Sequence, residues 1–508
     1  MAEHSRTRFT ILNTSVSSAV RIITILMGFI TRMVFTRMLD QHYVGISGLF
    51  LDFFQLLSLS ELGISVAVTY ALYKPIADND TEKQKSIMAL YRRFYNIVAL
   101  IVLSVGLIMF PFLDYLIKDQ PHVDQLQLIY ILYLINAVVS YLFVYKRTLI
   151  EAHQRMYISM LYYGLFMLLQ YVLQIVILVC TKNFILYLII YLLCTCLHNI
   201  AISQKANKLY PYLKEKDIHP ISADDKQDII KNIKAMFIHK IGAVVVKNTD
   251  SLLISSMIGI VSTACYSNYR LIIGSLQQIL NQIFQGVSAS IGNLGVTDDN
   301  RTLKNAFDSI FFIGFWVYGF STICLLELSS PFIALCFGQE YVFSSDVNFL
   351  LCLNFYMTGI RQAVLSFRDS LGLFRYDRYK SIAEAIVNLI ASIILTYHFG
   401  ISGILLGTLI STVMIPLWIE PYILFKYRLH YPLYRYFVKL CLYSLVIIIG
   451  GVCTHAICSY IDGSYIYQLL IKVPVCVIIP NLCVLLFLHR TPGFNFFIER
   501  ILQFIKNK

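Results

Sequence analysis

Long apolar runs, separated by short charged or turn-forming stretches, are the feature of this sequence that most constrains its fold. The run from Ile97 to Pro111, for example, holds no charged residue. A helix needs about 20 apolar residues to cross a bilayer core, whereas strands of an outer-membrane barrel alternate apolar and polar residues over about ten positions. The runs therefore predict an all-α polytopic membrane protein and exclude a membrane β-barrel.

Composition supports this fold class. Hydrophobic residues make up 58% of the 508 residues and charged residues only 14%, whereas soluble domains contain roughly 45–50% apolar and about 25% charged residues. A soluble enzyme is therefore excluded.

Charge clusters and turn residues divide the chain into about 14 predicted transmembrane helices. The predicted spans are 13–38, 44–73, 94–117, 126–145, 156–180, 184–203, 235–257, 265–291, 307–326, 348–367, 381–397, 402–424, 441–458 and 467–488. Spans one, two, seven and eight are the most polar.

Basic residues alternate between the two sides of this predicted topology. Of the 41 Lys and Arg residues, only Lys118 and Lys182 fall in the odd-numbered loops. Since basic loops are retained in the cytoplasm, both termini of this multi-pass membrane protein are expected there. The net charge of +12 then reflects membrane topology, and no nucleic-acid partner is expected.

The loops limit the possible chemistry. Neither the outer loop at about 327–348 nor the cytoplasmic loop at about 204–234 can hold a folded domain, and no phosphate-binding loop for ATP is present. The 12 Cys are scattered and form no zinc or disulfide pattern. We therefore expect no enzymatic activity, no catalytic residues, no metal and no bound cofactor.

An internal repeat divides the chain further. An offset of 219 residues aligns Met38 with Met257 and Arg21 with Lys240. This alignment predicts an N-terminal lobe at 1–215 with six helices and a C-terminal lobe at 216–430 with six more. Residues 431–508 supply two extra helices and, from Phe494, an amphipathic helix at the membrane interface.

Basic residues within the spans cluster by helix. Ionisable groups in hydrocarbon usually face a bundle interior or a wet cavity. At 100° per residue, Arg21 and Arg32 return to the same face of their helix, and so do Lys240 and Lys247. With Arg270, these residues predict a positively charged central cavity for an anionic substrate. The alternative is that the two arginines reach opposite interfaces by snorkelling.

Charged partners inside the spans leave two interpretations open. Asp52, Glu61 and Asp250 are either counter-ions, with Asp250 paired to Lys247, or sites of proton or cation coupling. Asp52 and Glu61 would lie on opposite faces of one regular helix and so form no shared acid pair. Glu384 is expected at the cytoplasmic interface.

Several stretches resemble a known family. Residues 35–39 (FTRML), 43–50 (YVGISGLF), 57–64 (LSLSELGI) and 72–77 (LYKPIA) are similar to the polysaccharide transporter (Wzx-type oligosaccharide flippase) family of the multidrug/oligosaccharidyl-lipid/polysaccharide (MOP) exporter superfamily. Residues 247–250 (KNTD) and 266–269 (YSNY) resemble the start of that family's second lobe.

The resemblance implies two six-helix lobes (MATE/MurJ-like) plus two C-terminal helices, with helices one, two, seven and eight lining the cavity. It also implies alternating-access flipping of an undecaprenyl-diphosphate-linked oligosaccharide for capsule, O-antigen or exopolysaccharide synthesis. An H+ or Na+ gradient would drive transport, and membrane lipids and other polysaccharide-assembly proteins would be partners. The alternatives are a multidrug or other lipid-linked precursor exporter of this superfamily, and a membrane glycan polymerase or ligase.

Overall fold

Helices are the only regular elements in the described part of the chain. The computed structural model describes residues 2–61, 63–118, 123–143, 145–215, 217–296, 300–373, 376–377, 379–491 and 493–495. These residues form two compact units, Met1–Ala264 and Cys265–Lys508, called here the first and the second unit.

The first unit contains a long N-terminal helix followed by shorter and partly broken helices. Its elements are α1 (Ala2–Met38), α2 (Gln41–Leu57), η1 (Ser58–Glu61), α3 (Ile64–Ala77), α4 (Thr81–Met109), η2 (Phe110–Phe112), α5 (Leu113–Leu116), α6 (Leu126–Tyr141), α7 (Tyr145–Ala152), α8 (Met156–Thr181), α9 (Phe184–Leu209), η3 (Pro211–Lys214), α10 (Ala223–Leu253) and the π-helical turn η4 (Ile254–Ile258).

The second unit starts within α11, whose first turn belongs to the first unit. Its elements are α11 (Ile260–Val296), α12 (Asn300–Cys336), η5 (Gln339–Tyr341), α13 (Ser345–Ile360), α14 (Gln362–Ser370), α15 (Lys380–Phe399), α16 (Ile401–Met414), α17 (Pro416–Leu424), the π-helical turn η7 (Phe425–Leu429), α18 (Tyr434–Cys458) and α19 (Tyr465–Leu488).

Each predicted span coincides with helical segments among the described residues. Within the described ranges, nine helices are long and apolar enough to cross a membrane, or ten if the bent pair α6 and α7 counts as one span. Predicted spans two, seven, eight and ten do not pass this test. Span two is broken into α2 and α3, spans seven and eight correspond to the polar helices α10 and α11, and span ten corresponds to the short helix α13. The chain is thus an all-α multi-pass membrane protein.

The second predicted span differs most from its prediction. Residues 44–73 form two helices, α2 and α3, joined by the 3-10 turn η1 and by Gly63 at φ 86°. Only glycine adopts this left-handed conformation without steric cost, so Gly63 permits the break. Hydropathy averages over a window and does not detect such an interruption.

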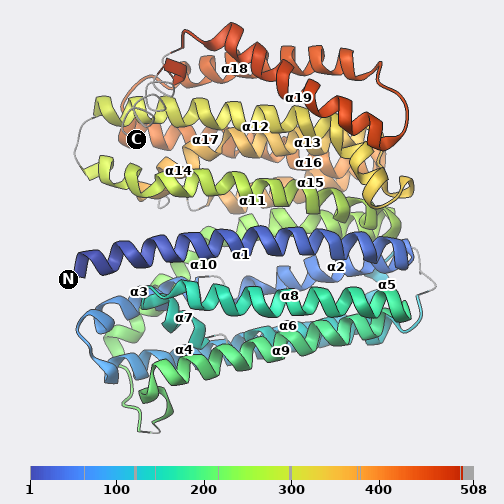
Figure 1. The fold of residues 1–508 in the computed structure, drawn as a ribbon. Coiled ribbons are helices and arrows are strands. Elements are labelled where there is room, and N and C mark those ends of the chain that lie inside the picture. The colour runs from blue at the N-terminus through green and yellow to red at the C-terminus, as the bar shows by residue number, and fades with distance from the viewer. Residues whose placement is uncertain are drawn as a thin grey trace. The chain divides into compact units, whose positions relative to one another are not determined.

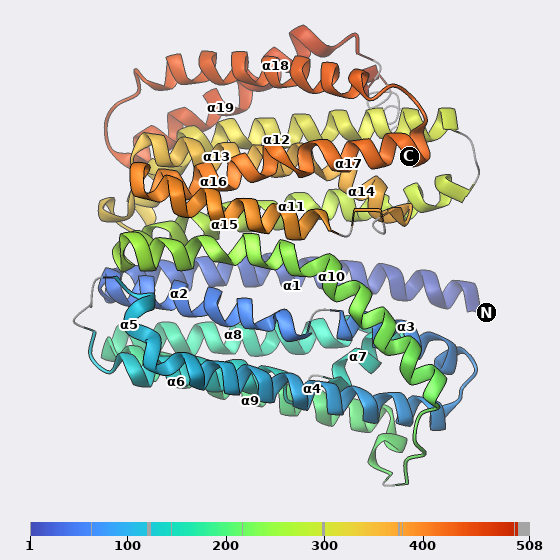
Figure 2. The same cartoon turned by 180° about the vertical axis from the view of Figure 1, so that it is seen from behind.

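The first unit is built from closely packed helix pairs. Figure 1 shows α1 and α8 side by side, and Figure 2 shows α4, α6 and α9 together. A Cβ atom at Gly164 of α8 would lie 2.8 Å from the Val20 side chain of α1, so the absence of a side chain there lets the two helices approach.

The seventh predicted span belongs to the first unit. Helix α10 contacts α2 and α3, and it crosses α3 in Figure 2. The border between the compact units therefore follows α10, whereas the predicted lobe border between residues 215 and 216 precedes it. The division into lobes at 1–215, 216–430 and 431–508 remains a prediction.

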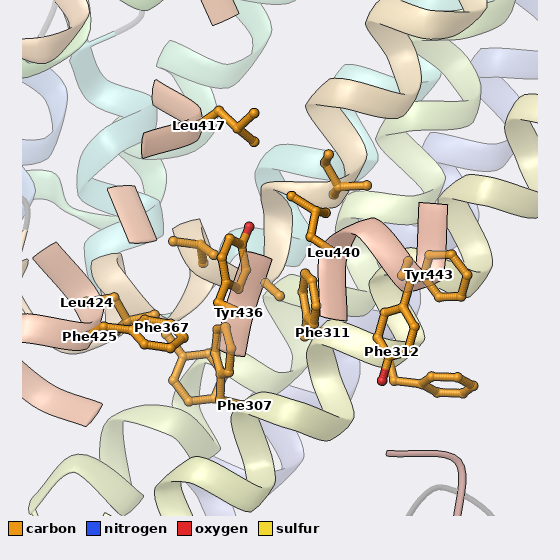
Figure 3. Packing of buried hydrophobic residues seen from close by; sticks show 14 of the residues in the cluster. Phe307, Phe311, Phe312, Phe367, Leu417, Leu424, Phe425, Tyr436, Leu440 and Tyr443 are labelled. Carbon is orange, nitrogen blue, oxygen red and sulfur yellow. The ribbon is translucent and has the colours of Figure 1, made fainter. Parts of the chain in front are cut away.

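Aromatic side chains form the core of the second unit (Figure 3). Phe307 and Phe311 on α12 stack with ring centroids 5.8 Å apart, and Tyr436 of α18 lies 5.0 Å from Phe311. Tyr443, two turns further along α18, stacks on Phe315 with ring centroids 4.7 Å apart. This contact attaches α18 to α12, so the first of the two extra C-terminal helices is part of the unit's core.

Two predicted connecting regions are shorter than expected, and the predicted tail lies outside the described residues. Helix α12 continues to Cys336, so most of the outer loop predicted at 327–348 is helical. Helix α9 extends to Leu209 and α10 begins at Ala223, which shortens the loop predicted at 204–234. The amphipathic helix predicted from Phe494 falls almost entirely in residues 496–508, which are not described.

Candidate functional site

Arg21 lies in the N-terminal half of the membrane span of α1, Leu12–Met38, and is half-buried. Its positive charge acts on the hydroxyl group of Tyr163 on α8, the helix against which α1 packs. The guanidinium is therefore within electrostatic range of a polar aromatic side chain on a neighbouring helix of the first unit.

Arg32, three turns further along α1, lies in an aromatic environment. Its guanidinium carbon is 5.6 Å from the centroid of the Phe35 ring, a cation–π distance. Its charge also acts on the hydroxyls of Tyr133 on α6 and Tyr187 on α9. Arg21 and Arg32 thus both act on tyrosines of one helix group, α6, α8 and α9.

Buried amides continue this polar region inside the first unit. Gln170 donates a hydrogen bond to Gln174 at 3.2 Å, and Gln174 donates to the backbone oxygen of Tyr187 at 3.4 Å. Asn136 is buried, and its side-chain oxygen has no hydrogen-bond partner among the described residues. Such an oxygen can accept a hydrogen bond from a water or from a ligand hydroxyl.

We call these side chains the polar interior of the first unit. It comprises Arg21, Arg32, Tyr133, Asn136, Tyr163, Gln170, Gln174 and Tyr187. Cationic, amide and phenolic groups at membrane depth can hold an anionic group and hydroxyl groups together. The sequence pattern identified the two arginines, whereas the amides and tyrosines lie on three other helices and could not be connected to them by spacing.

Asp52 and Asp250 are both placed at the contact between α2 and α10. Asp52 is 9% exposed and accepts a hydrogen bond from the hydroxyl of Ser251. Asp250, next to Ser251, is also buried. The two carboxylates therefore come from helices that pack together, although they are far apart in sequence.

Glu61 lies in a different environment because α2 ends between it and Asp52. It belongs to η1, and its charge acts on the hydroxyls of Tyr91, Tyr95 and Tyr141. Tyr91 lies 3.1 Å from the Thr148 hydroxyl and 3.3 Å from that of Tyr95. The predicted single helix through both acids is therefore wrong, and the two acids have separate surroundings.

Three further predicted cations are placed only in part. The backbones of Lys240 and Lys247 lie in α10 of the first unit, and their side chains lie outside the described part of the structure. Arg270 lies on α11 in the second unit and is half-buried.

The most extensive set of buried charges is in the second unit and was not predicted as a group. Glu420 of α17 is 0% exposed. Arg361, between α13 and α14, donates two hydrogen bonds to it, from Nε to Oε2 at 3.0 Å and from Nη2 to Oε1 at 2.7 Å. Lys380, at the start of α15, donates a third.

The network extends to three more side chains. Arg368 of α14 donates to Asp377 at 2.6 Å, and Arg361 lies 3.7 Å from Glu384. Glu384 is therefore buried within this network, and its position at the cytoplasmic interface stays a prediction. We call the six residues the ion network of the second unit: Arg361, Arg368, Asp377, Lys380, Glu384 and Glu420.

Sequence contained one signal for this network, since Glu420 and Arg361 are charged residues within predicted spans. Its members come from three helices, α14, α15 and α17, and from the connections that precede α14 and α15, so no spacing rule connects them. Among the described residues, no group of three or more His, Cys, Asp or Glu side chains is arranged to hold a metal ion.

Solved structures with a similar fold are membrane transporters. The lipid II flippase MurJ in an inward closed conformation has a TM-score of 0.66 at 15% identity, covering 93% of this chain and 98% of that chain. An inward-facing multidrug resistance MATE family transporter of the MOP superfamily has a TM-score of 0.61 at 15% identity, covering 80% of this chain and 97% of that chain. A MOP superfamily transporter from Pyrococcus furiosus has a TM-score of 0.50 at 14% identity, covering 80% and 92%.

These likenesses confirm the predicted MATE/MurJ-like helical fold, and at these identities they show the fold alone. No curated protein matches the chain in sequence. A family model described as "Polysaccharide biosynthesis protein" matches residues 11–289, which is more than half of the chain, from α1 into α11. The resemblance read from residues 35–77 and 247–269 is thereby confirmed, and the chain belongs to the polysaccharide biosynthesis protein family.

Proposed function

We propose that this protein is a flippase that moves a lipid-diphosphate-linked oligosaccharide from the inner to the outer leaflet of a bacterial cytoplasmic membrane. The observation that carries the proposal is the position of Arg21 and Arg32 in a membrane span, within electrostatic range of tyrosines on neighbouring helices of the first unit. Family membership and the fold shared with a lipid II flippase support it.

The chemistry of the polar interior suits such a substrate. A guanidinium can bind a phosphate through two parallel hydrogen bonds, so Arg21 and Arg32 would hold the diphosphate. Tyrosine rings and buried amides such as Gln174 would contact the sugars, while the prenyl chain stays in the lipid. No covalent bond changes in this process.

Lys240, Lys247 and Arg270 are proposed as further diphosphate or sugar contacts during alternating access. The polymer would be a capsule, an O-antigen or an exopolysaccharide, and undecaprenyl diphosphate would be the lipid carrier. Both chain termini are proposed to lie in the cytoplasm, where other polysaccharide-assembly proteins would be partners.

An H+ or Na+ gradient is the proposed energy source. Asp52, Glu61 and Asp250 are the candidate coupling residues. Asp52 is supported by its burial and by its hydrogen bond from Ser251 on another helix, because a charge change there would alter the contact between α2 and α10.

The two alternatives differ in substrate or in reaction. A multidrug exporter of the same superfamily is disfavoured by Arg21 and Arg32, because the usual drug substrates are cations. A membrane glycan polymerase or ligase would need a larger outer loop, whereas α12 and α13 are joined only by residues 337–344.

Complementation of a deletion strain tests the proposal. Arg21→Ala and Arg32→Ala should abolish surface glycan without loss of protein from the membrane, and repeat units should accumulate on the inner face. Arg21→Lys should restore part of the activity, since it keeps the charge but loses the bidentate geometry. Arg155→Ala, which removes an arginine outside the predicted spans of the first unit, is the control.

Two outcomes would contradict the proposal. Normal surface glycan in both alanine variants would exclude diphosphate binding by these residues. Repeat units that accumulate on the outer face of the deletion strain would indicate a polymerase instead.

A further inference from the structure

A basic pocket lies in the first unit, apart from the polar interior described above. It has a volume of about 370 Å³ and is formed by the first turns of α4, the start of α7 and the segment 212–218. Four basic side chains line it, Lys85, Arg92, Arg93 and Lys146, against one acidic side chain, Glu215.

The one acidic residue that lines the pocket, Glu215, already forms an ion pair with Lys85. Lys85 lies 2.7 Å from Glu215 and 2.6 Å from Glu82, and its side chain is buried. Arg92 and Arg93 have no acidic partner among the described residues, and Lys146 donates to Asn207, a neutral amide. Three positive charges in the pocket therefore remain uncompensated.

The Lys146 ammonium group lies within electrostatic range of two other cations. The charges of Arg92 and Lys214 both act on the Lys146 ammonium group. Arg92 and Arg93 are exposed and Lys146 is half-buried, and such a group of basic side chains lining one pocket attracts an anion. Arginine side chains match the geometry of a phosphate in particular.

The surface next to the pocket is apolar, which favours the phosphate group of a lipid over a free phosphate ion. At 100° per residue, Ile97 and Leu100 lie within about 40° of Arg93 on α4. Both side chains are exposed, Ile97 at 53% and Leu100 at 61%. A cationic pocket is thus continuous with an exposed apolar face of a membrane-spanning helix, as a phosphate with attached acyl chains requires.

We propose that this pocket binds the phosphate headgroup of an anionic membrane lipid, with the acyl chains along Ile97 and Leu100. The pocket lies on the side of the chain where Lys and Arg are concentrated, which is the expected cytoplasmic side. Basic pockets between helices on that side are suited to anionic headgroups. This inference does not depend on the proposed transport function.

Native mass spectrometry of the purified full-length protein, released from phosphatidylcholine nanodiscs that contain a minor fraction of phosphatidylglycerol, tests the site. Wild-type protein should retain phosphatidylglycerol in preference to phosphatidylcholine. Arg92→Gln with Arg93→Gln should weaken this retention about 30-fold, from the known contribution of each basic residue at an anionic surface. Lys226→Gln with Lys231→Gln is the control, because both lysines are exposed on α10 of the same unit and do not line the pocket.

Further variants and a competitor separate the remaining explanations. Lys146→Gln should also weaken the retention of phosphatidylglycerol. This variant keeps Arg92 and Arg93, which help to orient the protein during membrane insertion. Equal retention by wild type and pocket variants, or equal loss in the α10 control, would overturn the proposal. Displacement of the lipid by millimolar inorganic phosphate would show a site for free anions and would overturn it as well.

Discussion

Arg361 binds Glu420 through two parallel hydrogen bonds, from Nε at 3.0 Å and from Nη2 at 2.7 Å. The carboxylate is fully buried and receives Lys380 as well. This pair connects the junction of α13 and α14 to α17, two regions that are distant in sequence. Its members are charged residues in a largely apolar helical unit, so each depends on the others for compensation.

Removing one charge from this network should destabilise the protein strongly. Glu420→Gln leaves Arg361 and Lys380 without their shared carboxylate, and an uncompensated buried charge costs about 3–5 kcal/mol. Asp225→Asn is a suitable control, because Asp225 and Lys83 form an ion pair with both side chains 40% exposed, worth about 0–1 kcal/mol. The loss of unfolding free energy is measured for both variants in mixed micelles. Similar losses in Glu420→Gln and Asp225→Asn would contradict a buried network.

Gly45 should tolerate no side chain. A Cβ atom there would lie 2.2 Å from the backbone oxygen of Ile260 at the start of α11. Gly45→Ala must therefore separate α2 from this backbone, and we expect a loss of about 1–3 kcal/mol in stability. Gly274→Ala in α11 meets no atom within 4 Å and should be neutral or stabilising by up to about 1 kcal/mol. Thermal unfolding of the two variants checks the difference, and an unaffected Gly45→Ala protein would refute the close approach.

Asp52→Asn tests the proposed coupling role. The amide oxygen can still accept the hydrogen bond from Ser251, so the contact between α2 and α10 should persist while the titratable group is lost. We expect normal protein levels and a surface-glycan yield that no longer responds to the proton or sodium gradient. Asp228→Asn, at an exposed position of α10, should behave like wild type. Wild-type gradient dependence in Asp52→Asn would make Asp52 a structural counter-ion.

Cysteine labelling tests the predicted orientation. Asp462 lies in the exposed connection between α18 and α19, and Asp78 in the exposed connection between α3 and α4. With both termini in the cytoplasm, a membrane-impermeant maleimide should label Asp462→Cys in intact spheroplasts and Asp78→Cys only after permeabilisation. The unsubstituted protein, with its 12 native Cys, gives the background. The reverse pattern would invert the topology.

The fold class could be predicted from the amino-acid sequence, because the length of apolar runs and the positions of basic residues are local properties of the chain. The helical segments under all fourteen predicted spans, the family membership of residues 11–289 and the charged positions Arg21, Arg32 and Asp52 follow from patterns that need no knowledge of the packing.

Tertiary structure alone decided which side chains act together. The tyrosines near Arg21 and Arg32, the contact of Asp52 with Ser251 and the ion network around Glu420 each join helices that are far apart in sequence. The break at Gly63 was missed for a related reason. Periodicity shows which face of a helix is polar, but the partner of that face is chosen by packing between helices.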